Sequence, residues 1–107
     1  MQAALKAIAE PRRREILRLV WSRERPAGEI AASFPEVTHA AISQHLRVLR
    51  EAALVTERRD GRRRLYRARP ESMEGLRAFL DEFWDDALAR LKAHVESDQR
   101  EEQTDDR

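Results

Sequence analysis

The middle of the chain places a capped amphipathic helix directly before a short hairpin, a combination that narrows the possible folds considerably. Thr38 is a good N-cap, and the helix that it begins is predicted to run to about Ala52. After this helix the pattern becomes extended, with Asp60-Gly61 between two arginine-rich arms. An Asp-Gly pair favours a hairpin, because both central residues of the preferred turn need a positive φ angle. We expect the second arm to return antiparallel, with Leu65 facing the core.

The segments before this helix also have a helical pattern. The expected helices lie at residues 3–9, 12–23 and 29–34. Pro11 suits the first turn of the second helix, and Pro35 ends the third. In the second helix apolar residues recur at helical spacing, opposite a face of arginines. We therefore expect its tryptophan, Trp21, to lie in the core.

A longer helix is expected from roughly Glu71 to Val95, after Pro70. Its apolar stripe is too wide and too aromatic to face water. The stripe consists of Met73, Leu76, Phe79, Leu80, Phe83, Trp84, Ala87, Leu88, Leu91 and Val95. A second copy of the chain in a two-fold dimer is the simplest cover, and packing wholly within one chain is the alternative. Residues 96–107 are polar, acidic and without pattern, which predicts a disordered tail.

The order of these elements indicates a fold class. Four helices, a hairpin and a final helix describe a chain that is mainly α with a small β-hairpin. Two short helices joined by a tight turn, the second capped and followed by a basic hairpin, are typical of a winged helix-turn-helix.

Charge is distributed unevenly along the chain, although the net charge is only +1. Through Pro70 there are 16 Lys and Arg against 8 Asp and Glu, and from Glu71 onward there are 5 against 12. A basic body favours a polyanion as partner, and two solvated surfaces of opposite sign are the alternative. With Cys 0 the chain has no disulfide and no thiolate metal site. No apolar run approaches the roughly 20 residues of a membrane span, so we expect a cytoplasmic protein with no membrane partner.

One face of the capped helix is suited to contact DNA bases. At about 100° per residue, an arc of roughly 140° holds His39, Ala40, Ser43, Gln44 and Arg47. This face is polar and nearly uncharged, whereas a face that is only solvated would more often carry Glu and Lys. Gln44 pairs well with adenine and Ser43 can bond to several bases. Arg47 lies one turn further on, where a phosphate is the better partner.

The hairpin is strongly basic. Its arginines are Arg58, Arg59, Arg62, Arg63, Arg64, Arg67 and Arg69, and the accompanying acid near the turn is Asp60. A bound polyanion relieves the repulsion among so many guanidiniums. Arg62 and Arg63 are the first candidates for contact with backbone phosphate or the minor groove. The alternative is that these charges only protect an edge strand from aggregation.

Three stretches of the chain resemble bacterial repressors of the ArsR/SmtB type. The opening helices of that family are similar to residues 5–17, LKAIAEPRRREIL. Its recognition helix resembles residues 41–55, AISQHLRVLREAALV, and its wing resembles residues 60–66, DGRRRLY. The match spans about residues 5–95 in the right order. It implies a homodimeric winged-helix regulator, usually a repressor, that binds near-palindromic double-stranded DNA and dimerises through its first and last helices.

Pattern and resemblance together give the candidate site residues. The base-reading candidates are Thr38, His39, Ala40, Ser43 and Gln44. The candidates for phosphate and wing contacts are Arg47, Arg59, Arg62, Arg63 and Arg64, with Arg62 at the wing tip. The dimer-interface candidates are Leu5, Ile8, Met73, Leu76, Leu80, Phe83, Trp84, Ala87 and Leu91. Residues 1–95 are expected to form the DNA-binding and dimerisation domain, followed by the tail at residues 96–107.

The sequence departs from the family pattern at two places. Ala53 stands where the family often has Gly, and a left-handed conformation there costs Ala about 1 kcal/mol or more. Either the helix ends differently or Ala53 is mildly strained. Family members that sense thiophilic metals have cysteines near the start of the third helix, where this chain has RPAGE at residues 25–29. That metal site is absent from the sequence.

Neither a cofactor nor an enzyme activity is expected. The last helix combines carboxylates with one imidazole at Asp81, Glu82, Asp85, Asp86, His94 and Asp98. A solvated acidic face is the simpler interpretation of this set, and a metal site there stays open. No Gly-rich phosphate loop or nucleophile–base pair occurs. The alternative function is a winged-helix dimer that binds an acidic protein partner, and the effector is open.

Overall fold

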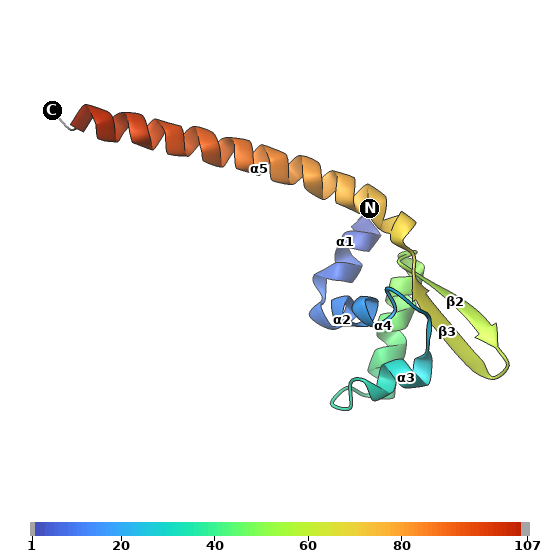
Figure 1. The fold of residues 1–107 in the computed structure, drawn as a ribbon. Coiled ribbons are helices and arrows are strands. Elements are labelled where there is room, and N and C mark those ends of the chain that lie inside the picture. Colours follow the sequence, from blue (N-terminus) through green and yellow to red (C-terminus); the bar gives the residue numbers. More distant parts are fainter. Residues whose placement is uncertain (1, 106–107) are drawn as a thin grey trace. The chain divides into compact units, whose positions relative to one another are not determined.

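The structure is a computed structural model that describes the backbone of residues 2–105 and the side chains of residues 2–98. The helices and strands follow one another as shown in Figure 1: α1 Gln2–Ala9, α2 Pro11–Leu19, β1 Arg25–Pro26, α3 Ala27–Ala32, α4 His39–Glu51, β2 Val55–Asp60, β3 Arg63–Ala68 and α5 Pro70–Asp105. The chain divides into two compact units, Met1–Leu76 and Arg77–Arg107. The predicted fold class, mainly helical with a small hairpin in winged helix-turn-helix order, is confirmed.

Helix α2 begins at Pro11 as expected but ends at Leu19, before the predicted end at Arg23. Glu10 caps it, because the backbone N–H of Arg13 donates to the Glu10 Oε2 at 3.0 Å. A proline in the first helical position loses no hydrogen bond, since its missing N–H would have no partner there. Sequence and structure therefore agree on where this helix starts and disagree on its end.

The prediction that Trp21 lies in the core is wrong, because its side chain is 45% exposed. Helical periodicity places Trp21 on the buried face only if the helix continues through it. The chain instead leaves the helix at Val20, whose carbonyl accepts a hydrogen bond from the N–H of Ala68 in β3 at 2.9 Å. This bond directs the segment after α2 toward the sheet, so Trp21 lies outside the helix and off its buried face.

Helix α4 is capped and buried as the sequence predicts. The Thr38 Oγ1 accepts a hydrogen bond from the N–H of Ala41 at 3.1 Å. Ile42, Leu46 and Leu49 form its buried stripe. This stripe fixes the rotation of α4 about its own axis, because any other rotation would expose three large apolar side chains.

The turn that joins α3 to α4 is held from α2. The Arg12 Nη1 pairs with the Glu36 Oε1 at 2.8 Å. The same guanidinium lies 5.0 Å from the centroid of the Phe34 ring, a distance typical of a cation–π contact. Phe34 itself is buried. One arginine thus ties the helix-turn-helix to the preceding helix through both charge and an aromatic face.

Ala53 adopts the left-handed conformation that the sequence left as one of two alternatives, with φ 60°. The N–H of Ala53 donates to the carbonyl of Arg50 at 2.9 Å, and the N–H of Leu54 donates to the carbonyl of Leu49 at 3.0 Å. These two bonds form a Schellman motif, in which the left-handed residue is usually glycine. Leu49 and Leu54 are both fully buried, as the apolar contact of that motif requires.

The sheet is antiparallel with strand order β1-β3-β2. The strand β1 was not expected, and it pairs Arg25 with Tyr66 and Pro26 with Leu65. As the central strand, β3 is hydrogen-bonded along both of its edges. Its residues Leu65, Tyr66 and Ala68 are buried. The burial of Leu65 was predicted.

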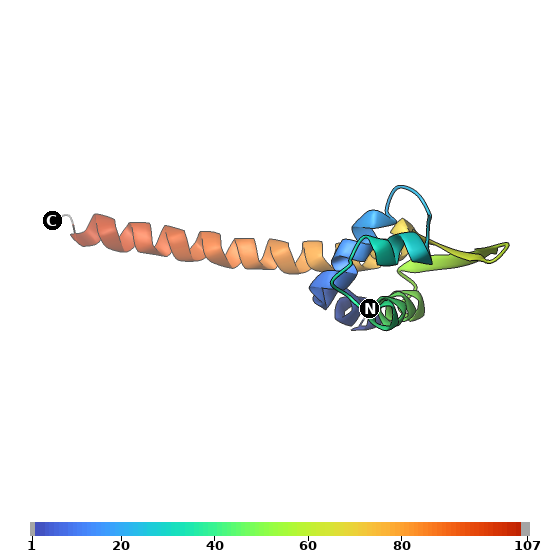
Figure 2. The ribbon, with the colours of Figure 1, turned by 90° about the horizontal axis from the view of Figure 1, so that it is seen from below.

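The hairpin turn lies one residue later than predicted. Asp60 pairs with Arg63, so Gly61 and Arg62 are its central residues. Gly61 has φ 65°, and glycine at the first central position is a favoured two-residue hairpin. Arg62 consequently lies at the tip of the wing. Figures 1 and 2 both show this hairpin projecting away from helices α1 to α4.

The core of the first unit joins its helices, the sheet and the first turns of α5. Its fully buried large side chains are Ile16, Val20, Ile30, Ile42, Leu49 and Leu54. Leu76 is buried in the same cluster. No helix among the described residues is long and apolar enough to span a membrane.

Helix α5 continues past its expected end at Val95 as far as Asp105. The segment expected as a tail is therefore helical through residue 105, and residues 106–107 lie outside the described part of the chain. In the second unit large apolar side chains are exposed, with Phe83 at 61% and Trp84 at 63%.

Candidate nucleic-acid interface

The polar face of α4 points outward from the first unit. The side chains on this face that are exposed are those of Thr38, His39, Ala40, Ser43, Gln44 and Arg47. They lie opposite the buried stripe described above. The face is narrow and carries small side chains at its N-terminal end, so the backbone of α4 can approach a surface closely there. Helices of this kind fit the major groove of B-DNA, which is about 12 Å wide.

Arg47 forms an ion pair with Glu51 one turn further along α4, and its Nε lies 3.0 Å from the Glu51 Oε1. Both side chains are more than half exposed. An exposed pair at this spacing contributes about 0.3–0.5 kcal/mol. Such a weak contact leaves the guanidinium available to a phosphate.

A hollow of about 240 Å³ brings the polar face of α4 together with the wing. Its lining residues are Ala27, Ser43, Leu46, Arg47, Arg50, Arg64 and Tyr66. Three predicted contact residues, Ser43, Arg47 and Arg64, therefore border one surface, although they come from α4 and β3. Three guanidiniums therefore border one hollow, and carboxylates paired with them offset part of their positive charge.

Glu57 organises the arginines at the base of the wing. Its side chain is only 16% exposed, and its Oε1 lies 3.5 Å from the Arg64 Nε. It also forms an ion pair with Arg50, and this hydrogen bond raises the pKa of Arg50. Burial raises the pKa of the neighbouring Tyr66, and the Glu57 carboxylate adds to that shift. Arg50 and Tyr66 thus join the site although the sequence analysis did not select them.

The arginines of the wing differ in their partners. Arg63 lies 3.2 Å from the Asp60 Oδ2 across the turn, and Arg58 pairs with Glu24. This pairing lowers the pKa of Glu24 and raises that of Arg58. Within the described part of the chain, Arg59 and Arg62 form no ion pair. Arg62 to Arg64 also border a second hollow of about 380 Å³ with residues 26–28 of β1 and α3.

The predicted dimer-interface residues fall into two groups. Those of the first unit are partly or fully buried in one chain: Leu5, Ile8, Met73 and Leu76. Those of the second unit are exposed, except for the half-buried Ala87: Leu80, Phe83, Trp84 and Leu91. The first group is covered at least in part within one chain, whereas the second group leaves a broad apolar surface in water.

The acidic residues of α5 do not gather into a metal site among the described side chains. His94 and Asp98 approach one another, with the His94 Nε2 3.6 Å from the Asp98 Oδ2. No group of three or more His, Cys, Asp or Glu side chains suited to a metal ion occurs in the described part of the chain.

The sequence of this chain is similar to a known domain family and to characterised transcriptional regulators. Residues 8–58 match a family described as a helix-turn-helix domain. The HTH-type transcriptional regulator Rv2034 of Mycobacterium tuberculosis is 38% identical over 95 residues, which cover 89% of this chain and 88% of that protein. The transcriptional repressor SdpR of Bacillus subtilis is 38% identical over 61 residues, 57% of this chain and 67% of SdpR.

Solved structures show the same fold. A crystal structure of a possible transcriptional regulator for arsenical resistance superposes with a TM-score of 0.72 at 52% identity, covering 83% of this chain and 92% of that one. A homodimeric winged helix-turn-helix DNA-binding domain from Mycobacterium bovis, a possible ArsR-family regulator, superposes with a TM-score of 0.63. That domain is 32% identical and covers 79% of this chain and 78% of its own.

Proposed function

Because this chain belongs to the ArsR-type family of winged helix-turn-helix transcriptional regulators, we propose that it is a homodimeric repressor of a near-palindromic DNA operator. As a member of that family it is a DNA-binding regulator and not an enzyme. The single observation that carries the proposal is the exposed, nearly uncharged face of α4 beside an arginine-lined hollow. Such a surface combines base contact with phosphate binding.

The residues divide into the roles that their positions support. Ser43 and Gln44, with the capping residue and first turn of α4, contact base edges in the major groove. Arg47 and Arg64 bind backbone phosphates beside them, and the wing tip at Arg62 reaches the neighbouring phosphate or minor groove. Arg59 and Arg63 add to the positive potential that attracts the duplex.

Dimerisation supplies a second α4 helix, which can contact the second half-site of the operator. The exposed apolar surface of α5 is too large to stay in water, and a second copy related by a two-fold axis covers both surfaces at once. The homodimeric state of the M. bovis domain and the name of SdpR as a repressor support this assignment. Two α4 helices would then contact half-sites about one helical turn apart, on the order of 10 bp. We assign both DNA binding and dimerisation to residues 1–95.

Fluorescence anisotropy tests this proposal. The full chain is titrated into the duplex that lies upstream of its own gene and into a scrambled duplex, across a salt series. Tight binding to the first duplex, with two chains per duplex, is expected. Equal, weak and salt-sensitive binding to both duplexes would mean that the operator lies elsewhere or that an effector is needed for binding, and no binding even at low salt would contradict the proposal and favour a protein partner instead.

A further inference from the structure

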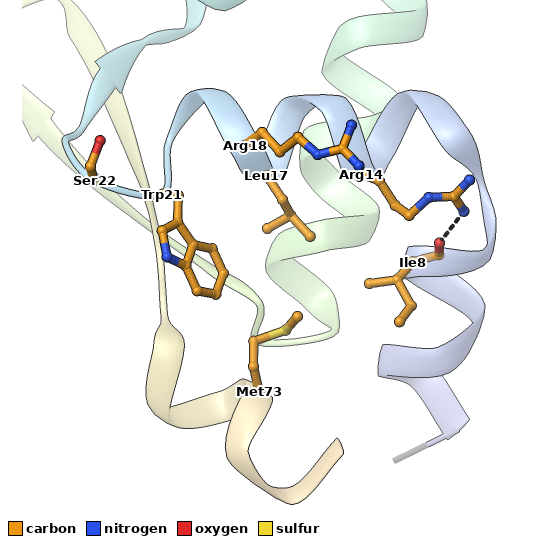
Figure 3. Close-up of a pocket in the computed structure, with 7 residues that line it drawn as sticks. All are labelled: Ile8, Arg14, Leu17, Arg18, Trp21, Ser22 and Met73. Atoms are coloured by element: carbon orange, nitrogen blue, oxygen red, sulfur yellow. Dashed lines mark hydrogen bonds between the residues drawn. The ribbon is translucent and has the colours of Figure 1, made fainter. Parts of the chain in front are cut away.

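The first unit contains a hollow of about 560 Å³ on the side of α2 that carries Arg14 and Arg18. It is bordered by α1, α2, the connection that follows α2 and the first turns of α5 (Figure 3). The lining residues are Ile8, Arg14, Leu17, Arg18, Trp21, Ser22 and Met73. All of them belong to Met1–Leu76, so the hollow is a feature of one compact unit.

The walls of the hollow are apolar. Figure 3 shows the side chains of Ile8, Leu17, Trp21 and Met73 directed toward a common space. Leu17 is buried, whereas Ile8 and Met73 are partly buried against the core. The exposed Trp21 indole, which leaves the helical frame of α2, forms one side. Ring and thioether surfaces of this kind bind flat or extended apolar groups well.

One edge of the hollow is cationic. Arg14 and Arg18 lie one turn apart on α2, where two like charges repel each other by a few tenths of a kcal/mol. The Arg14 Nη1 donates to the carbonyls of Ile8 at 2.7 Å and Ala9 at 3.1 Å, which fixes the guanidinium at the end of α1. The Arg18 guanidinium makes no hydrogen bond or ion pair with the described residues.

The other arginines of α2 differ from Arg18. Arg12 pairs with two carboxylates, those of Glu15 and Glu36. Arg13 donates to the carbonyls of Lys6 and Ala7. No acidic side chain lines the hollow. The apolar space therefore has two positive groups at its edge, of which Arg14 is held by hydrogen bonds, and no acidic side chain among its lining residues.

We propose that this hollow binds a small amphipathic organic anion, a carboxylate carried on an acyl or aryl body. The apolar walls cover the body, and the planar guanidinium of Arg18 receives the carboxylate through paired N–H···O bonds. The volume lies within the range of about 300–1,000 Å³ that is usual for small-molecule sites. A neutral or cationic molecule of equal size lacks the interaction with the guanidiniums.

Isothermal titration of the full chain with sodium decanoate, below its micelle-forming concentration, tests the site without DNA. The failure of this test is therefore distinct from a failure of the proposed operator binding. Decanoate is expected to bind at one site per chain, whereas 1-decanol and decyltrimethylammonium bind at least about tenfold more weakly because they lack the charge-assisted hydrogen bonds.

Matched variants identify the residues responsible. Arg18→Gln is expected to weaken decanoate binding about tenfold or more, and Trp21→Ala to weaken decanoate and decanol alike. Arg23→Gln removes the same charge from an exposed residue that pairs with Glu29 and does not line the hollow, so decanoate affinity should not change. Thermal unfolding of each variant checks that the fold is retained.

Two results would overturn the proposal. The first is the absence of decanoate binding by the parent, and the second is equal affinity of the Arg18→Gln variant and the parent. If the first result is found and sedimentation shows that Arg18→Gln weakens self-association, a second copy of the chain occupies the hollow instead.

Discussion

At the scale of single residues, Ala53 holds a conformation that a side chain disfavours. Its φ of 60° places the Cβ close to the following carbonyl, at a cost of about 1–2 kcal/mol. Ala53→Gly removes this strain, and the greater freedom of glycine in the unfolded chain offsets about 0.4–1 kcal/mol of the gain. We expect the free energy of unfolding to rise by about 0.5–1 kcal/mol, measured by urea denaturation with an unchanged m-value.

The neighbouring residue offers a matched control for this substitution. Ala52 caps the same helix with φ −81°, a negative φ that does not favour glycine over alanine. Ala52→Gly should therefore lower the free energy of unfolding by roughly 0.5–1 kcal/mol. If both glycine variants were destabilised, the conformation of Ala53 would not be the source of strain.

Gln44 lies in the middle of the exposed polar face, where its amide can pair with one base edge in the major groove. Gln44→Ala should reduce the preference for the correct base at one position per half-site, by about 1–3 kcal/mol. Non-specific binding should change little, because a neutral amide contributes little to counterion release. Competition between the operator and single-base variants measures this effect, and a uniform loss across all positions would contradict base contact.

At the scale of elements, two arginines at the end of the wing lack a strong carboxylate partner among the described residues. Arg62 lies at the tip, and Arg63 pairs there with the exposed Asp60. The double variant Arg62→Ala, Arg63→Ala should weaken binding to every duplex and flatten the plot of log affinity against log salt by up to about two units. An unchanged salt slope would mean that the wing does not contact phosphate.

Glu57 neutralises part of the charge where the wing meets α4. Glu57→Gln leaves Arg50 and Arg64 without their shared carboxylate, so the affinity for non-specific duplex at low salt should rise about two- to fivefold. Glu15→Gln, which removes a carboxylate paired with Arg12 on α2, should have a much smaller effect. Fluorescence anisotropy measures both affinities. A lower affinity of the Glu57→Gln variant would show that Glu57 aids DNA binding by holding Arg50 and Arg64 in position, more than it opposes binding by its charge.

The elements that the sequence predicts best are those whose signals are local. The cap at Thr38, the buried stripe of α4 and the position of Leu65 depend on neighbouring residues, and all were predicted. The strand β1 has only two residues and is a strand only because it pairs with β3, about 40 residues later in the chain, so no local pattern predicts it. Trp21 was misplaced for the same reason, since a bond to β3 ends the helical frame before it.

In the candidate site, too, features set by neighbouring residues were predicted, and features that need contacts between distant segments were not. Helical periodicity alone identifies which side chains of α4 share a face, and the structure exposes that face. The grouping of Arg47, Arg50 and Arg64 around one hollow requires α4 and β3 to meet, which no spacing in the sequence encodes. Glu57 likewise reaches Arg50 only because β2 follows directly from the turn at Ala53.

At the scale of the whole molecule, the two units carry net charges of opposite sign and present different kinds of surface. The basic first unit presents the polar face and the wing, and the acidic second unit carries apolar side chains that are exposed in one chain. A winged domain with one recognition helix contacts a single half-site. If two chains associate through α5, as proposed above, the apolar surface of the second unit determines the affinity of the first unit for an operator with two half-sites.

Phe83→Glu tests this link directly. The Phe83 side chain is exposed, so the substitution does not disturb the core of the first unit, but in a dimer it would place a charge in an apolar interface. We expect the variant to sediment as a monomer and to lose at least tenfold in operator affinity. Its affinity for a duplex that carries a single half-site should equal that of the parent.

Lys92→Glu provides the control on the same helix, because it adds negative charge at an exposed polar position and leaves the apolar stripe intact. Circular dichroism of both variants should show that the first unit is folded. If Phe83→Glu sedimented as the parent does and retained full operator affinity, the exposed stripe of α5 would not be the dimer interface. The two half-sites would then have to be linked through another surface of the chain.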